Sequence, residues 1–169
     1  GYGDSCTVAI PAAQVAELPR QLFRFHGCGM GAALDVRAAR AVLAVRLASL
    51  ARGYSGVSLP LLERLAWLLN ENITPVIPEE GSVGASGDLT PLSYVAAVLA
   101  GERDVIYRGE RTTSAAVHAH LGVTPLQLRP KEGLALMNGT AVMTALACIA
   151  YVRAEQAATL SSRITAMSV

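Results

Sequence analysis

The sequence lacks the features that mark several classes of protein. Its three cysteines, Cys6, Cys28 and Cys148, are widely spaced and form no Cys-x-x-Cys motif, so neither a disulfide framework nor a thiolate zinc site is expected. Like charges form no run and the formal net charge is +1, so the chain offers no electrostatic footprint for nucleic acid or an anionic membrane. These absences predict a small, roughly neutral partner and no bound metal.

Long hydrophobic runs are also missing. The longest unbroken apolar run, Ala145 to Val152, is shorter than the roughly 20 residues that a membrane span needs. No basic start followed by an apolar stretch and a small-residue cleavage site is visible. Because the cysteines suit a reducing compartment, we expect a cytoplasmic protein without a membrane segment.

What is present is a helical pattern. Hydrophobic residues make up 52% of the 169 residues and aromatic residues only 5%, which is typical of one helical domain with a sizeable core. Between residues 33 and 52, Leu43, Leu47 and Leu50 recur at i, i+4 and i+7, while Arg46 and two further arginines can lie off that stripe. This spacing predicts an amphipathic helix.

Capping and breaking residues predict the other helices. One helix begins after Ser58 and ends near Asn70, and another begins near Thr90, with Pro91 in its first turn, and ends at Gly101. Two short helices are expected over residues 113–121 and over "KEGLALM", the second broken at Asn138 and Gly139. Within the first of these short helices, His118 and His120 lack the spacing of a helical metal site and are expected on the surface.

A β-hairpin and a long helix complete the predicted fold. The segment "DVIYRGERT" alternates around Arg108 and Gly109 and is the only convincing strand signal, expected as an excursion on the surface. From Thr140 onward there is neither Gly nor Pro, which predicts a helix of up to about 30 residues, or roughly 45 Å. A helix longer than a small domain needs packing partners beyond this chain.

The glycine-rich stretch "GSVGASGDLTP", residues 81–91, is open to three interpretations. A phosphate-binding loop would use backbone N–H groups at a helix N-terminus, but the lysine of a Walker-type loop is missing and Asp88 would repel a phosphate. A plain glycine turn is the second interpretation. In the third, the loop itself reacts: the Gly87 nitrogen closes a five-membered ring on the Ala85 carbonyl, and loss of the Ser86 hydroxyl leaves a methylidene electrophile.

The longer stretch "GSVGASGDLTPLSYVA" resembles the signature of the aromatic amino acid ammonia-lyase family, which includes histidine, phenylalanine and tyrosine ammonia-lyases and related aminomutases. The segments "LFRFHGCGMG", "YSGVS", "ITPVIPEEGSVG" and "EGLALMNGT" resemble the family in the same order, so the resemblance covers essentially the whole chain. It implies a prosthetic group, 4-methylidene-imidazole-5-one, formed from Ala85, Ser86 and Gly87 without an external cofactor.

The resemblance also implies the organisation of the chain. Family members are several-fold longer, so this chain is expected to be a piece of a longer one. Its fold is then mainly α: residues 1–139 form a helical domain with a short β-hairpin, and residues 140–169 begin the first long helix of a central helical bundle. Family active sites are built from several chains of a homotetramer, which predicts a homo-oligomer for the full protein.

Site residues follow by position from the same resemblance. Tyr2, in "GYGDSC", stands where the family has the base that takes the substrate β-proton, although the following residues depart from the family pattern. Asn138 matches the asparagine that holds the prosthetic group and substrate. Phe25 and His26 match the residues that select the substrate ring, and His26 favours a polar ring. The alternatives are a plain loop tyrosine, a helix-ending asparagine and a core histidine.

The implied reaction is the non-oxidative removal of ammonia from an aromatic L-amino acid, giving an α,β-unsaturated acid. The substrate amine adds at the methylidene carbon on Ser86, and Tyr2 takes the β-proton. Histidine is favoured as substrate, with tyrosine or phenylalanine next. An aminomutase with the same prosthetic group is one alternative. A catalytically silent fragment whose Ala-Ser-Gly has not cyclised is the other.

Asp88 is expected either to cap the following helix or to hold the loop, and the glycines of "HGCGMG" are expected in close helix packing.

Overall fold

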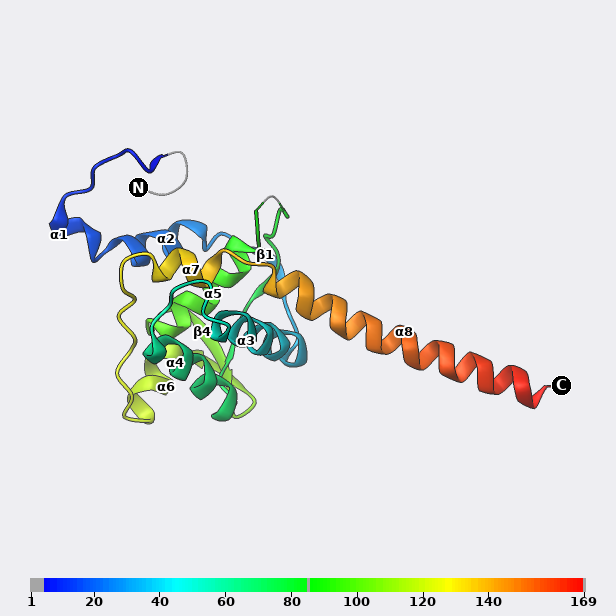
Figure 1. Ribbon diagram of the computed structural model, residues 1–169. Coiled ribbons are helices and arrows are strands. Elements are labelled where there is room, and N and C mark those ends of the chain that lie inside the picture. The colour runs from blue at the N-terminus through cyan, green and yellow to red at the C-terminus, as the bar shows by residue number, and fades with distance from the viewer. Residues whose placement is uncertain (1–4, 85, 169) are drawn as a thin grey trace.

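The computed structural model describes residues 5–84 and 86–168, and it is mainly helical, as predicted. Figure 1 shows a body of short helices from which one long helix projects. The helices are α1 (Ala12–Val15), α2 (Leu18–His26), α3 (Val36–Ala51), α4 (Leu59–Asn70), α5 (Leu89–Leu99), α6 (Ser114–His120), α7 (Glu132–Met137) and α8 (Ala141–Met167). The strands are β1 (Met30–Ala33), β2 (Thr74–Pro75), β3 (Pro78–Glu80), β4 (Asp104–Tyr107) and β5 (Glu110–Thr113).

Helix α5 is the centre of the core. Every residue from Pro91 to Leu99 is buried, as expected of a helix that is apolar on all sides. Helices α2 and α7 pack against α5 and against each other, while α3 packs against α4 and α8. The largest fully buried apolar side chains come from α3, α4, α5, α7 and the β2 region, and they are Leu43, Leu50, Leu61, Leu65, Leu68, Ile73, Ile77, Leu92, Leu99, Leu136 and Met137.

Helix α3 begins three residues later than the sequence pattern predicts. Asp35 is its N-cap, and the Asp35 carboxylate accepts a 2.7 Å hydrogen bond from the Ala38 N–H. Ala33, the first residue of the predicted helix, is instead the last residue of strand β1. A side-chain acceptor at the N-cap satisfies an N–H group that has no partner within the helix, and this fixes the start of the helix at Val36.

The hairpin forms where predicted. Arg108 (φ 53°) and Gly109 (φ 85°) occupy its two-residue turn between β4 and β5, and two left-handed residues suit the twist of a tight hairpin. Its expected place as a surface excursion is wrong, because β4 also pairs with β2 and Val105 is fully buried. A second small sheet, β1 paired with β3, was not predicted.

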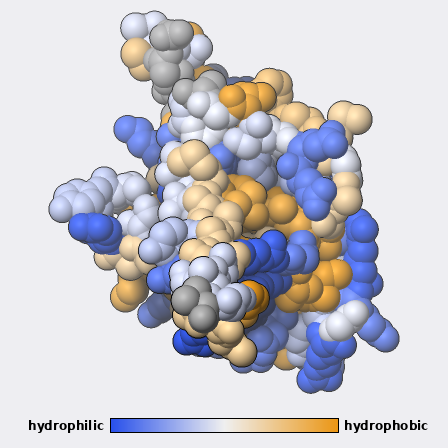
Figure 2. Space-filling model, turned by 90° about the vertical axis from the view of Figure 1, so that its right-hand side faces the viewer, coloured by the Kyte–Doolittle hydropathy of each residue, from blue (hydrophilic) through white to orange (hydrophobic). Residues whose placement is uncertain are grey.

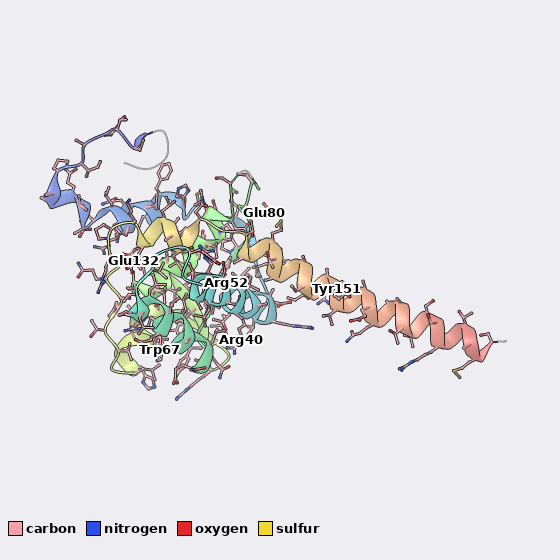
Figure 3. The ribbon with its side chains drawn as sticks, viewed as in Figure 1. Arg40, Arg52, Trp67, Glu80, Glu132 and Tyr151 are labelled. Carbon is pink, nitrogen blue, oxygen red and sulfur yellow. The ribbon has the colours of Figure 1, made fainter. Side chains whose placement is uncertain are left out.

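Helix α8 leaves the body of the molecule. Only Ala141, Val142 and Ala145 of its 27 residues are buried, and its first turns pack on α3. Figure 2 looks toward its free end and shows apolar atoms gathered along and beside it, and Tyr151 lies on the projecting part (Figure 3). The large apolar side chains exposed on α8 are Met143, Leu146, Tyr151, Val152, Leu160, Ile164 and Met167.

The stretch Glu132–Met167, which combines α7 and α8, is long and apolar enough to cross a membrane by length and composition alone. About a third of its most apolar 18-residue window is buried in this structure. A core helix of a soluble protein has the same length and composition, so this property does not distinguish the two settings.

Candidate active site

The glycine-rich loop connects β3 to α5 at one end of the core. Gly84 and Gly87 have φ angles of 64° and 129°, values at which a residue with a β-carbon is strained. Ser86 is exposed on this loop, while Ala85 lies outside the described residues. The loop therefore presents a serine hydroxyl at the surface of this chain, between backbone positions that suit glycine.

The Asn138–Gly139 turn lies directly against this loop. The Asp88 N–H donates a 2.8 Å hydrogen bond to the Gly139 carbonyl. A β-carbon added at Gly87 would lie 2.9 Å from the Gly139 nitrogen and 3.1 Å from its carbonyl oxygen. Such distances are closer than ordinary contacts, so only glycine fits at position 87 without movement of the backbone. The fold thus brings together two motifs that are far apart in the sequence, and the Asn138 side chain is exposed beside them.

Asp88 holds the loop to the long helix. Its carboxylate accepts hydrogen bonds from the Ser82 hydroxyl at 2.8 Å and from the Val142 and Met143 N–H groups at 2.9 and 3.1 Å. It is the N-cap of α5 but makes no side-chain capping bond there, so the expectation that it caps the following helix is wrong. The alternative expectation, that Asp88 holds the loop, agrees with these bonds, which also satisfy N–H groups of α8.

Arg46 holds the other side of the Asn138–Gly139 turn. Its guanidinium donates to the carbonyls of Leu136 at 2.8 Å, Asn138 at 3.1 Å and Ala135. The side chain comes from α3 and is only 3% exposed. Burial lowers the pKa of Arg46, and the negative charge of Asp88 acts in the opposite direction. Arg46 lies off the apolar stripe of α3, and its spacing in the sequence gives no sign of this contact.

Phe25 and His26 lie at the end of α2. Their rings meet edge to face with 5.1 Å between centroids, and Phe25 is 79% exposed while His26 is partly buried. The segment that follows them runs beside the start of the glycine-rich loop, because Met30 pairs with Glu80. Phe25 and His26 thus precede the strand that pairs with the start of the loop, and the Phe25 ring is open to solvent.

The glycines after His26 are not in a helix, contrary to expectation. Gly27 is the C-cap of α2, and its carbonyl accepts a 2.8 Å hydrogen bond from Arg103. The Gly29 N–H donates to the Tyr94 hydroxyl at 3.1 Å. A β-carbon at Gly29 would lie 3.0 Å from the ring of Pro78, so this segment is a tightly packed connection from α2 to β1.

The remaining predictions concern Tyr2 and the two histidines His118 and His120. Tyr2 lies outside the described residues. His118 is buried at 1% exposure, against the expectation of a surface residue, and its Nδ1 lies 2.9 Å from the Ser114 carbonyl, whereas His120 is exposed. Within residues 5–84 and 86–168, no group of three or more His, Cys, Asp or Glu side chains could hold a metal ion.

Comparison with known proteins places this geometry in a family. The model of the family described as aromatic amino acid lyase matches residues 1–169, which is the whole chain. The chain belongs to the aromatic amino acid lyase family. The resemblance seen in the sequence is therefore confirmed, and the loop and turn described above lie in a member of that family.

Individual relatives of this chain include proteins named as lyases and as aminomutases. Histidine ammonia-lyase of Shouchella clausii is 46% identical over 168 residues, which is 99% of this chain and 34% of its own. The solved structure of tyrosine aminomutase from Streptomyces globisporus gives a TM-score of 0.79 at 48% identity, over 86% of this chain and 27% of that chain. Histidine ammonia-lyase from Trypanosoma cruzi gives a TM-score of 0.82 at 38% identity, over 89% and 29%.

These comparisons also give the extent of the match. The chain spans about a third of the length of the curated relatives that it matches. The match to the solved structures supports the helical fold, because the similarity covers most of this chain.

Proposed function

We propose that the protein containing this chain is an ammonia-lyase that removes ammonia from an aromatic L-amino acid without oxidation, leaving an α,β-unsaturated acid. Histidine is the favoured substrate, with tyrosine or phenylalanine next. The observation that carries the proposal is the contact of Gly87 and Asp88 with Gly139, which joins the Ala-Ser-Gly loop to the Asn138 turn. Both segments are parts of the chain that resemble the family.

The described residues fit the prosthetic group that this function requires. Gly87 has a φ of 129° and no room for a β-carbon, so its nitrogen is not crowded by a side chain of its own. In ring formation, the Gly87 nitrogen bonds to the Ala85 carbonyl carbon, whose oxygen leaves as water with the amide hydrogens of Ser86 and Gly87. The Ser86 hydroxyl leaves as a second water with the hydrogen of the Ser86 α-carbon. When formed, the group supplies an electrophile that turns the substrate amine into a better leaving group.

Side chains of this chain have proposed roles around that loop. Ser86 and its neighbours Ala85 and Gly87 supply the reactive backbone, and the exposed Asn138 amide can both donate to and accept from the substrate or the loop. Tyr2 is proposed as the base that takes the β-proton, for which its phenol needs a pKa below the ordinary value of about 10.

The substrate ring is proposed to lie against Phe25 and His26. The imidazole of His26 can hydrogen-bond a polar ring, whereas Phe25 offers an exposed apolar surface next to it. Because the Phe25 ring is open to solvent in the single chain, we propose that the remaining walls of the pocket come from the rest of the protein and from other copies in a homo-oligomer, with a tetramer expected.

An aminomutase is the second candidate function. It is favoured by the 48% identity to tyrosine aminomutase, a value similar to the 46% identity to histidine ammonia-lyase. A catalytically silent piece is the third, because the chain spans about a third of its curated relatives. The carboxylate-binding and remaining reactive groups would then lie outside these 169 residues.

Two measurements test the proposal. Intact mass of the protein should be lower by two waters than the sequence requires, and an unmodified mass would remove the electrophile from the proposal. Ultraviolet spectroscopy should then detect urocanate, coumarate or cinnamate from histidine, tyrosine or phenylalanine in the whole protein. If β-amino acids form instead of these three acids, the aminomutase is correct.

A further inference from the structure

We propose that Arg46 is a positioning residue for ring formation, which it serves by fixing the Asn138–Gly139 turn against which Gly87 is placed. This inference rests on the proposed function, because it concerns how the Ala-Ser-Gly loop is held before it cyclises. Arg46 belongs to α3 and lies in none of the sequence segments that resemble the family signature.

The first step of the inference is the set of partners around Arg46. Helix α7 has six residues, and the last carbonyls of a helix have no partner within it. The Arg46 guanidinium donates to three such carbonyls, those of Ala135, Leu136 and Asn138. One side chain from another helix therefore terminates α7 and fixes where the chain turns toward α8.

The second step is the transmission of that position to the loop. A β-carbon at Gly139 would lie 2.0 Å from Arg46 Nη1, and Arg46 is held in place by its three bonds, so the turn passes directly over the guanidinium. Gly139 also accepts the Asp88 N–H and leaves no space for a β-carbon at Gly87. Gly139 thus lies against both Arg46 and Gly87, so a shift of Arg46 is passed through Gly139 to Gly87.

The third step is the choice of residue. Burying a guanidinium costs free energy, and an apolar side chain of similar size would often be as stabilising. Hydrogen bonds to several carbonyls in a fixed arrangement use the planar fork of arginine, which a lysine ammonium cannot reproduce. We therefore explain the buried charge of Arg46 by the position in which its hydrogen bonds hold the Asn138–Gly139 turn.

Ring formation is sensitive to such positioning because it joins two backbone atoms of one short loop. A bond forms from the Gly87 nitrogen to the Ala85 carbonyl carbon only when the two atoms approach closely. A displacement of about 1 Å in reacting groups can cost on the order of 100-fold in rate. The loss of Arg46 should consequently slow cyclisation even where the fold survives.

The experiment uses the whole protein to which these residues belong, in four forms: wild type, Arg46→Met, Arg46→Lys and Arg40→Met. Arg40, labelled in Figure 3, is the matched control, because it lies on the same helix and donates instead to the carbonyl of Leu69, near the end of α4, at 3.1 Å. Each protein is unfolded by denaturant directly after synthesis in a cell-free system and refolded, and intact mass follows the loss of two waters with time. Circular dichroism and denaturant unfolding report the folded fraction.

We expect wild type and Arg40→Met to lose two waters at similar rates, and the folded Arg46→Met to do so at least about tenfold more slowly, with Arg46→Lys in between. A folded Arg46→Met that cyclises at the rate of Arg40→Met would overturn the inference. If Arg46→Met does not fold, Arg46→Lys decides, since cyclisation at the wild-type rate would again overturn it. A wild-type protein that never loses two waters would instead overturn the proposed function.

Discussion

The carboxylate of Asp88 and the N–H of Val142 form a 2.9 Å hydrogen bond although 54 residues separate them in the chain. The same carboxylate accepts the Ser82 hydroxyl. One side chain therefore links the loop that carries Ser86 to the first turn of α8. A negative charge at the N-terminus of a helix is stabilised by the free N–H groups there, so the loop and the helix position each other.

Asp88→Asn should destabilise the protein by about 1–3 kcal/mol, because a charge-assisted acceptor at a helix N-terminus is replaced by a neutral amide. Ser82→Ala, which removes a single neutral donor, should cost about 1 kcal/mol or less. Denaturant unfolding followed by circular dichroism measures both changes. Equal effects of the two substitutions would show that the bonds to Val142 and Met143 contribute little.

Gly139→Ala should be destabilising by about 1–3 kcal/mol, because its new methyl group would meet the buried Arg46 guanidinium. The effect should depend on Arg46. In the double variant Gly139→Ala with Arg46→Ala, the methyl group has space, so the two changes should cost less together than the sum of the single effects. A double-mutant cycle of unfolding free energies tests this, and additivity within about 0.5 kcal/mol would contradict the contact.

Local sequence signals predicted the elements that depend on local chemistry. The turn at Arg108 and Gly109, the helix that ends at Asn70 and the helix that begins after Thr140 all lie within a few residues of their predicted places. Strands β1, β2 and β3 have two to four residues each, and each pairs with a strand far along the chain, without the tight turn that marks β4 and β5. They exist because of their pairing partners, which a short stretch of sequence does not contain.

The parts of the site that could not be predicted are contacts between distant residues. Arg46 lies off the apolar stripe of its helix, where a charged side chain is expected to be exposed. It is nevertheless buried, because it donates hydrogen bonds to carbonyls at the C-terminus of α7. Asp88 precedes α5 but caps α8. A family motif could indicate the Ala-Ser-Gly loop and the Asn138 turn separately, whereas the contact between them depends on how α3, α5, α7 and α8 pack.

The buried His118 predicts a specific response to acid. Burial lowers the pKa of His118, the Ser114 carbonyl acts in the opposite direction, and Arg64 lowers it further. The unfolded chain therefore binds a proton at about pH 6.5 while the folded chain still excludes it, so the free energy of unfolding falls as the pH decreases below about 6.5. His118→Gln should reduce this slope by at most about 1.4 kcal/mol per pH unit.

The control for this pH dependence is His120→Gln, since the His120 side chain is exposed on the same helix. Urea unfolding between about pH 7 and pH 5 gives the slope for each variant. If both substitutions change the slope equally, or neither does, His118 does not couple protonation to folding.

His26→Leu should change which ring the whole protein accepts. A leucine removes the hydrogen-bonding group while keeping an apolar contact next to Phe25, and a lost hydrogen bond to a substrate group costs about 1–3 kcal/mol, or about 5- to 150-fold. The ratio of kcat/KM for histidine or tyrosine to that for phenylalanine should fall by this factor. Phe25→Leu changes the neighbouring apolar surface without removing a polar group, so it should alter the ratio less. Product formation from the three amino acids measures both ratios, and an unchanged ratio in His26→Leu would place ring selection on residues outside this pair.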